Sequence, residues 1–111
     1  HQYEKTRDLV YYTIKKKIEF DGIFASNDLR AAGALEALIQ SGISVPRQVK
    51  IIGFDDTPTC LRCYPALSTV RQDPVTMAQN AVDLLLQQLN APQRLCKHLV
   101  LPVSIVERGT T

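Results

Sequence analysis

The chain has 111 residues, of which 45% are hydrophobic, and its formal net charge is +2 at pH 7. This length and composition allow one hydrophobic core of modest size. The charge is too small to indicate nucleic-acid binding by itself, and no apolar stretch approaches the roughly twenty residues of a membrane span.

The first part of the chain predicts a helix, a short strand and a second helix. Residues 4–17 have helical periodicity, and their lysine triplet suits a helix C-terminus. Residues 23–25 form a short buried strand after a break at Asp21 and Gly22. The next helix begins at Ser26 or Asn27 as its N-cap and ends at Gly42. The residues expected on one face of the first helix are Leu9, Val10, Thr13, Ile14 and Lys17.

The second part predicts two further strands, a long helix and a terminal pair of strands. Residues 49–54 and 66–71 are the strands, and residues 55–65 form an irregular link with room for one helical turn. Asp73 and Pro74 open a helix over residues 74–89, which residues 90–92 terminate. Residues 95–106 contain two strand-like pieces divided by Pro102.

Helices and strands mostly alternate in this order, which favours an α/β fold with right-handed crossovers. The strand over residues 49–54 is apolar apart from Lys50, as is typical of a parallel strand covered on both faces. We therefore expect a mostly parallel open sheet with helices on both faces.

Three predicted strands end in polar side chains, namely Asn27, Asp55 and Gln72. In an open parallel sheet, ligands bind outside the carboxyl ends of the strands. Amides and carboxylates can hydrogen-bond to adjacent hydroxyl groups, so this edge predicts a site for a hydroxyl-rich small molecule.

Each of these residues also has an ordinary structural interpretation. Asn27 could cap the helix that follows it, Asp55 could cap a turn, and Gln72 could bridge two lobes without touching a ligand. For Asp56, a cap or turn role is favoured over ligand contact.

The three cysteines, Cys60, Cys63 and Cys96, are odd in number, which argues against a closed disulfide framework and fits a reducing compartment. Cys60 and Cys63 have C-x-x-C spacing, and Cys96 with His98 could complete a zinc site. The second pair lacks ordinary zinc-finger spacing and the first lies in a predicted loop. Ordinary thiols are favoured over zinc or redox chemistry, and no cofactor or metal is expected.

An enzyme is not favoured. The side chains of Asp55 and Asp56 would diverge on an extended segment, and no hydrolase, zinc-protease or phosphate-binding motif occurs. His1 and His98 are the only histidines.

An ordered series of six phrases closely resembles the lactose/galactose-repressor family of bacterial transcription regulators. They are Phe-Ala-Ser-Asn-Asp at 24–28, Ala-Gly-Ala-Leu at 32–35, Gly-Ile-Ser-Val-Pro at 42–46, Ile-Ile-Gly-Phe-Asp-Asp at 51–56, Pro-Ala-Leu-Ser-Thr-Val-Arg-Gln at 65–72 and Leu-Pro-Val-Ser at 101–104. The series covers nearly the whole chain.

The resemblance implies the type I fold of periplasmic binding proteins, of which this chain would be the last part. Residues 1–72 would be most of the C-terminal lobe, residues 73–102 a helix and a strand of the N-terminal lobe, and residues 103–111 a return to the C-terminal lobe. The DNA-reading helix-turn-helix would lie outside this chain.

The resemblance also implies a function and partners. Asn27, Asp55 and Gln72 match effector-contacting positions, and the effector would be a sugar or sugar phosphate. The protein would be a cytoplasmic repressor of carbohydrate-use genes that binds operator DNA as a homodimer, with no membrane partner. The alternative is an exported sugar-binding protein of a transport system, against which the regulator-like phrase at 65–72 and the unpaired cysteines argue.

A dimer interface is implied on the helix after Asn27 and the loop after Asp56. An ordinary core helix would show the same apolar spacing, so both interpretations stay open. The implied interface residues are Ala32, Leu35, Glu36, Ile39, Leu61 and Tyr64.

Overall fold

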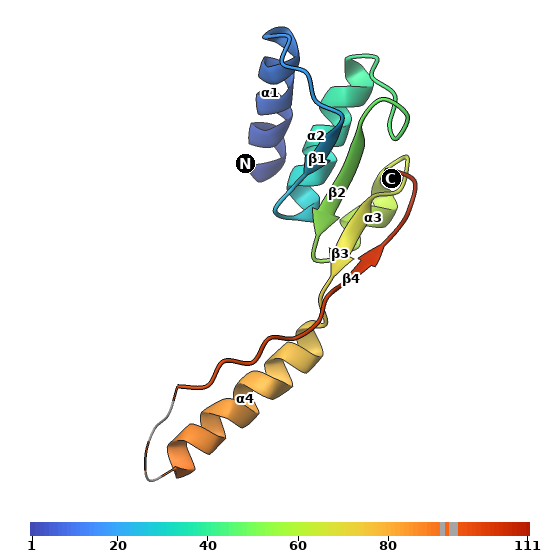
Figure 1. The fold of residues 1–111 in the computed structure, drawn as a ribbon. Coiled ribbons are helices and arrows are strands. Elements are labelled where there is room, and N and C mark those ends of the chain that lie inside the picture. Colours follow the sequence, from blue (N-terminus) through green and yellow to red (C-terminus); the bar gives the residue numbers. More distant parts are fainter. Residues whose placement is uncertain (92, 94–95) are drawn as a thin grey trace. The chain divides into compact units, whose positions relative to one another are not determined.

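The computed structural model describes residues 1–91, 93 and 96–111. The chain forms two compact units (Figure 1). Unit 1 contains His1–Arg71 and Ser104–Thr111, and unit 2 contains Gln72–Val103. The assignment of these units to two lobes of a larger core stays a prediction.

Unit 1 is built on a four-stranded sheet. The strands are β1 (Gly22–Phe24), β2 (Lys50–Phe54), β3 (Ser68–Arg71) and β4 (Ser104–Val106), in the order β1-β2-β3-β4. The first three run parallel, and β4 pairs antiparallel with β3. The predicted α/β class with a mostly parallel open sheet is confirmed.

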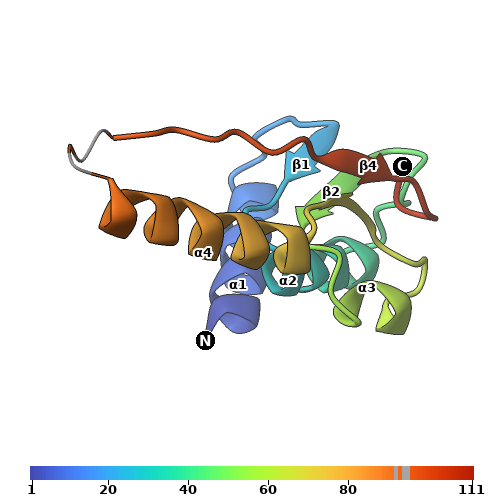
Figure 2. The ribbon, with the colours of Figure 1, turned by 90° about the horizontal axis from the view of Figure 1, so that it is seen from below.

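The helices of unit 1 are α1 (Gln2–Lys15), α2 (Asp28–Gln40) and the single turn α3 (Thr59–Arg62). They lie on one side of the sheet (Figure 2). Helices were expected on both faces, but in the described part of unit 1 the other face exposes Phe24 at 67% and Ile105 at 66%. No helix of unit 1 covers these two side chains.

Helix α1 packs on α2 with a face that matches the predicted one only in part. Only Val10 of α1 is buried, whereas Leu9 is 61% exposed. The helices meet closely at Gly33, where an added Cβ would lie 2.2 Å from the carbonyl oxygen of Tyr3. The contacting side of α1 therefore follows Tyr3, Val10 and Ile14, which leaves Leu9 outside. Lys17 lies beyond the end of the helix.

The core of unit 1 lies between α2 and the sheet. Asn27 caps α2, as predicted, and the helix ends at Gln40, with Ser41 as its C-cap just before Gly42. The buried apolar side chains of this core cluster come from α1, α2, α3, β2 and the loops that flank these elements. They are Val10, Ala25, Ala31, Ala34, Leu35, Ala37, Leu38, Val49, Ile51, Cys60 and Leu67.

Unit 2 consists of α4 (Pro74–Asn90) and the segment that follows it. Asp73 caps α4 by accepting hydrogen bonds from the backbone N–H groups of Val75 and Thr76, with Pro74 at the start, so the predicted helix is confirmed. No residue of α4 is buried. In the part of the chain that the structure describes, no helix is long and apolar enough to cross a lipid bilayer.

The strand predicted before Pro102 is absent from residues 96–101. A strand needs a neighbour for its backbone hydrogen bonds, and the described residues of unit 2 contain no other strand. Leu95, where this piece was predicted to begin, and Pro92, predicted to stop α4, lie outside the described residues.

Candidate functional site

The carboxyl ends of β1, β2 and β3 meet at one edge of the sheet, because the three strands are neighbours and run parallel. Asn27 follows β1 and Asp55 follows β2, so the structure brings these two predicted site residues to the same edge of unit 1. Gln72 follows Arg71, the last residue of β3, and is the first residue of unit 2.

Asn27 performs the capping role that the sequence left open. Its side-chain oxygen accepts a hydrogen bond of 2.9 Å from the backbone N–H of Arg30. Its Nδ2 donates to Gln2 Oε1 at 2.7 Å. The side chain is half-buried at the start of α2. Capping fixes its direction, and a second role as a ligand contact is compatible with it.

Asp55 and Asp56 form a sharp turn after β2. Their φ angles are 104° and 55°, which non-glycine residues seldom adopt. The N–H of Asp55 donates to Val70 O at 2.9 Å, and that of Asp56 donates to Thr69 Oγ1 at 3.3 Å. Asp56 lies in this turn, as expected, but its side chain pairs with two arginines instead of capping the turn. The turn places Asp55 directly after β2.

A buried carboxylate below this turn was not singled out from the sequence. Asp28 is 1% exposed. Its Oδ2 accepts hydrogen bonds from the N–H of Thr57 at 2.7 Å and from Thr57 Oγ1 at 2.9 Å, and its Oδ1 accepts from Thr69 Oγ1 at 2.5 Å. One side chain of α2 thus joins the loop after β2 to β3.

Gly53 makes room for Asp28. A Cβ at position 53 would lie 2.5 Å from Asp28 Oδ1, closer than real Cβ atoms come, and a tight 3.2 Å from the Cα of Asp28. A glycine inside a mostly apolar strand often marks the close approach of another group, and Gly53 is the sequence signal that could have indicated this carboxylate.

A second acidic residue lies between two arginines. Asp56 Oδ2 accepts from Arg71 Nε at 2.7 Å, and Asp56 Oδ1 accepts from Arg108 Nη2 at 2.7 Å. Hydrogen bonds from Arg108 and then Arg71 hold the pKa of Asp56 below its usual value. The sequence did not indicate this cluster, because its three members lie far apart along the chain.

The C-x-x-C pair lies beside the same region. Cys60 is buried, and burial together with the nearby Asp28 raises the pKa of its thiol to about 12. Burial also raises the pKa of Cys63. Raised thiol pKa values disfavour the thiolate that metal binding and redox chemistry need. Among the residues that the structure describes, no three His, Cys, Asp or Glu side chains are grouped as a metal site.

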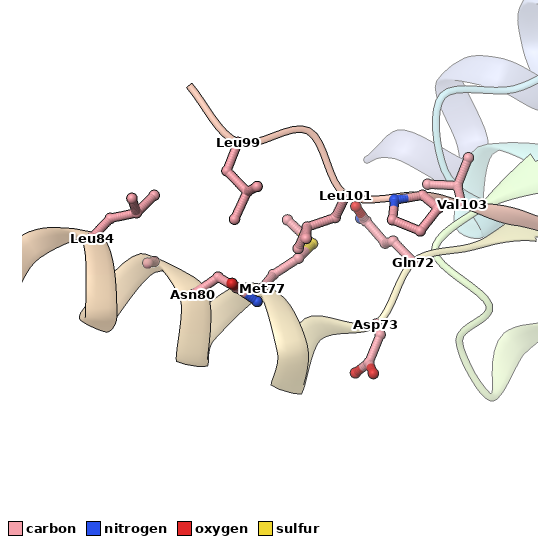
Figure 3. A pocket seen from close by; sticks show the side chains of 10 residues that line it. Gln72, Asp73, Met77, Asn80, Leu84, Leu99, Leu101 and Val103 are labelled. Carbon is pink, nitrogen blue, oxygen red and sulfur yellow. The ribbon is translucent and has the colours of Figure 1, made fainter. Parts of the chain in front are cut away.

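Gln72 lines a mostly apolar depression within unit 2. Figure 3 shows Leu99 and Leu101 pointing toward α4 from the segment that follows this helix, with Leu101 directed at Met77. The carboxylate of Asp73 points away. The depression is also lined by Asn80, Ala81, Leu84, Pro102 and Val103.

The family described as periplasmic binding protein-like domain matches residues 2–111. The chain belongs to this family. A helix-turn-helix-type transcriptional regulator, RegA of Clostridium acetobutylicum, is 37% identical over 87% of this chain and 29% of its own length. The lactose operon repressor of Rhizobium radiobacter is 31% identical over 97% of this chain and 91% of its own length. The resemblance to the lactose/galactose-repressor family is thus confirmed.

Two solved structures of this family superpose on nearly the whole chain. A LacI family transcriptional regulator from Arthrobacter sp. FB24 in complex with lactose is 33% identical with a TM-score of 0.82, over 98% of this chain and 41% of that one. The Lac repressor dimer bound to operator and the anti-inducer ONPF is 32% identical with a TM-score of 0.84, over 96% and 37%. This chain therefore spans well under half the length of the RegA relative and of these two structures.

A second surface of this chain lies on α2 and α3, and we call it the α2–α3 face. Ile39 is 47% exposed, Leu61 72% and Tyr64 92%, whereas Ala32 and Leu35 are buried in the core. Burial favours the core interpretation for Ala32 and Leu35, and the interface stays a prediction. Residues that line this face are Tyr3, Ala32, Leu35, Glu36, Ile39, Gln40, Thr59, Arg62, Cys63 and Tyr64.

A row of hydrogen bonds borders the α2–α3 face. Glu36 accepts from the hydroxyl of Tyr3, and Gln40 Nε2 donates to Glu36 Oε1 at 3.0 Å. Burial, followed by the bond to Glu36, raises the pKa of Tyr3 to about 12. Arg7 Nη1 lies 3.9 Å from Glu36 Oε1. Glu36, one of the predicted interface residues, is thus already paired within the chain.

Proposed function

We propose that this chain is part of the effector-binding core of a cytoplasmic bacterial repressor of carbohydrate-use genes, and that its effector is a sugar or sugar phosphate. One observation carries the proposal. Asn27 and Asp55 lie at the carboxyl edge of a parallel sheet in a chain that matches the periplasmic binding protein-like family over residues 2–111.

The chemistry of the proposed site suits a sugar. The carboxylate of Asp55 can accept hydrogen bonds from two neighbouring hydroxyl groups, and the amides of Asn27 and Gln72 can both donate and accept. Because a similar regulator has been solved with lactose, hydroxyl groups of a saccharide are the ligand chemistry we favour.

Regulation would follow from a difference in affinity. A sugar that binds one arrangement of the core more tightly than another shifts the population toward it. In a dimer, that shift would change the spacing of two DNA-binding heads over an operator. The similar Lac repressor dimer bound to operator supports this proposal, as does the helix-turn-helix type of the RegA relative.

The matched relatives also favour this function over an exported transport protein. They are named as regulators and operon repressors. A helix-turn-helix encoded upstream of this chain would support the proposed repressor, and a signal peptide there would contradict it.

Asp55→Ala in the complete protein tests the effector site. Loss of a partly buried charged acceptor should weaken sugar binding by about 2–3 kcal/mol, because its hydroxyl partners lose a charge-assisted hydrogen bond. The measurement is calorimetric titration with a panel of mono- and disaccharides that includes lactose. Binding to promoter DNA, followed by gel shift, should persist.

Asp21→Ala is the matched control, since Asp21 precedes β1 and lies at the opposite edge of the sheet. It should leave sugar affinity unchanged. Equal affinity in the Asp55→Ala and Asp21→Ala proteins would contradict the assignment of Asp55 to the site.

We also propose that the α2–α3 face is the surface through which two copies associate. Exposed aromatic and aliphatic side chains such as Tyr64 and Leu61 are typical anchors of protein interfaces. The dimeric state of the similar Lac repressor supports the proposal.

Tyr64→Ala should weaken that dimer by at least tenfold in Kd, because Tyr64 has almost no contacts within its own chain to lose. Sedimentation equilibrium of the complete protein measures the change, and Tyr12→Ala on the outside of α1 is the control. A dimer constant that is the same in both variants would place the interface elsewhere.

A further inference from the structure

The turn between β2 and α3 has a backbone conformation that needs support from the surrounding residues. Asp55 and Asp56 are consecutive non-glycine residues with positive φ angles of 104° and 55°. Such conformations persist only where the surrounding structure enforces them, and they gather at functional sites. The contacts that fix this turn therefore matter for where the side chain of Asp55 lies.

The two ends of the turn are fixed by backbone groups. At the near end, the N–H of Asp55 donates to Val70 O at 2.9 Å. At the far end, the N–H of Thr57 donates to Asp28 Oδ2 at 2.7 Å. The middle has one backbone contact, a bond of 3.3 Å from the N–H of Asp56 to Thr69 Oγ1.

The side chain of Asp56 supplies the strong contacts at the middle. Each of its oxygens accepts from a different arginine, Arg71 and Arg108, and both distances are 2.7 Å. The carboxylate is only 13% exposed and the side chain of Arg108 17%, so the pair with Arg108 is shielded from solvent, whereas the side chain of Arg71 is 54% exposed. Charge-assisted hydrogen bonds of this length are stronger than neutral ones.

The arginines are themselves anchored. Arg108 Nη1 donates to Leu67 O at 3.0 Å, and its backbone N–H donates to Ser68 Oγ at 2.8 Å. Arg71 ends β3, after which the chain leaves unit 1, and Arg108 follows β4, through which the chain returns. Asp56 thus ties the turn to both connecting strands of unit 1.

We propose that Asp56 is a positioning residue of the effector site, which holds the turn that presents Asp55 through its contacts with Arg71 and Arg108. The inference rests on the proposed function, because Asp55 is a ligand contact only under that function. Both oxygens of Asp56 accept from arginines, so a sugar would compete with those bonds to reach it. Its effect on binding is therefore exerted through Asp55.

The test uses Asp56→Asn and Arg71→Gln in the complete protein. Asp56→Asn removes the charge from both pairs. Arg71→Gln removes one pair from a side chain that is 54% exposed, and it keeps the proposal testable if the first variant does not fold. Asp8→Asn is the control, since Asp8 makes an exposed pair with Arg7 at 3.1 Å on α1.

Two readouts are needed, amide hydrogen exchange and calorimetric titration with lactose. We expect exchange at residues 55–57 to rise about tenfold or more in Asp56→Asn, and less in Arg71→Gln, because a charge-assisted contact is lost. Exchange in the core of α2, at Leu38, should stay unchanged. Lactose affinity should fall about tenfold in Asp56→Asn and stay unchanged in Asp8→Asn.

Two results would overturn the inference. One is exchange at residues 55–57 that matches the Asp8→Asn control. The other is faster exchange without any loss of lactose affinity, which would make the cluster purely structural. If the wild-type protein binds no lactose, the proposed function fails for that sugar, while the exchange result still decides whether Asp56 holds the turn.

Discussion

Helices α2 and α4 begin with the same kind of cap, but the two helices lie in opposite environments. Each is capped by a side-chain oxygen of the residue before it, Asn27 for α2 and Asp73 for α4. Yet α2, with 13 residues, buries eight of them, whereas α4, with 17, buries none. Local sequence signals therefore set where a helix begins, whereas the elements packed against the helix determine whether its residues are buried.

The difference lies in what each helix packs against. α2 lies between α1 and the sheet, and it also carries Asp28 into a buried polar network. Within the described residues of unit 2, α4 meets the segment that lines its depression. Its apolar residues stay exposed, which is typical of a surface that contacts another part of a protein. These residues include Val75, Met77, Val82, Leu85, Leu86 and Leu89.

The largest effect should come from removing the polar centre of unit 1. Asp28→Ala would leave three donors, on Thr57 and Thr69, without their acceptor in a buried site. We expect a loss of about 3 kcal/mol in the free energy of unfolding of unit 1, because an unsatisfied buried donor costs more than an unmade surface bond. Urea unfolding of the complete protein measures it.

Asp8→Ala, an exposed carboxylate on α1, should change the free energy of unfolding by less than about 0.5 kcal/mol. If Asp28→Ala lowers the free energy of unfolding by no more than this control, the hydrogen-bond network around Asp28 does not distinguish unit 1 from unit 2. The comparison would then rest on apolar burial alone.

The sequence predicted what depends on neighbours along the chain. Caps at Asn27 and Asp73, the helix end before Gly42 and the parallel strands follow from local residue types and periodicity. The family resemblance, carried by ordered phrases such as that at 65–72, is confirmed by the family match over residues 2–111.

What the sequence missed depends on distant partners. The clusters around Asp28 and Asp56 join residues that lie up to 52 positions apart, and no local pattern indicates such pairs. The buried face of α1 was misplaced at Leu9 because the close approach at Gly33, rather than hydrophobicity alone, sets which side contacts α2. The missing strand within 96–101 shows the same dependence, since a strand needs a partner.

The smallest effect should come from the cap of α4. Asp73→Ala removes the acceptor for the N–H groups of Val75 and Thr76, and the first turn of the helix should exchange its amides severalfold faster. Because α4 has no buried residues, unit 1 should keep its exchange rates. Asp83→Ala, in the middle of α4, is the matched control.

The contribution of Asp73 should also depend on pH in a defined direction. Hydrogen bonds from the hydroxyl and N–H of Thr76 lower the pKa of Asp73 in the folded state below its value in the unfolded chain. The stabilisation is therefore fully present above the unfolded pKa, about 4, and is lost as the pH falls through the lower folded value. Amide exchange in the first turn of α4, compared between wild type and Asp73→Ala at pH 6 and again at progressively lower pH, should converge at the acid end. A difference between wild type and Asp73→Ala in the exchange rates of unit 1 that follows the difference in α4 would mean that the two helices are not stabilised independently. The contrast between α2 and α4 would then have to be abandoned.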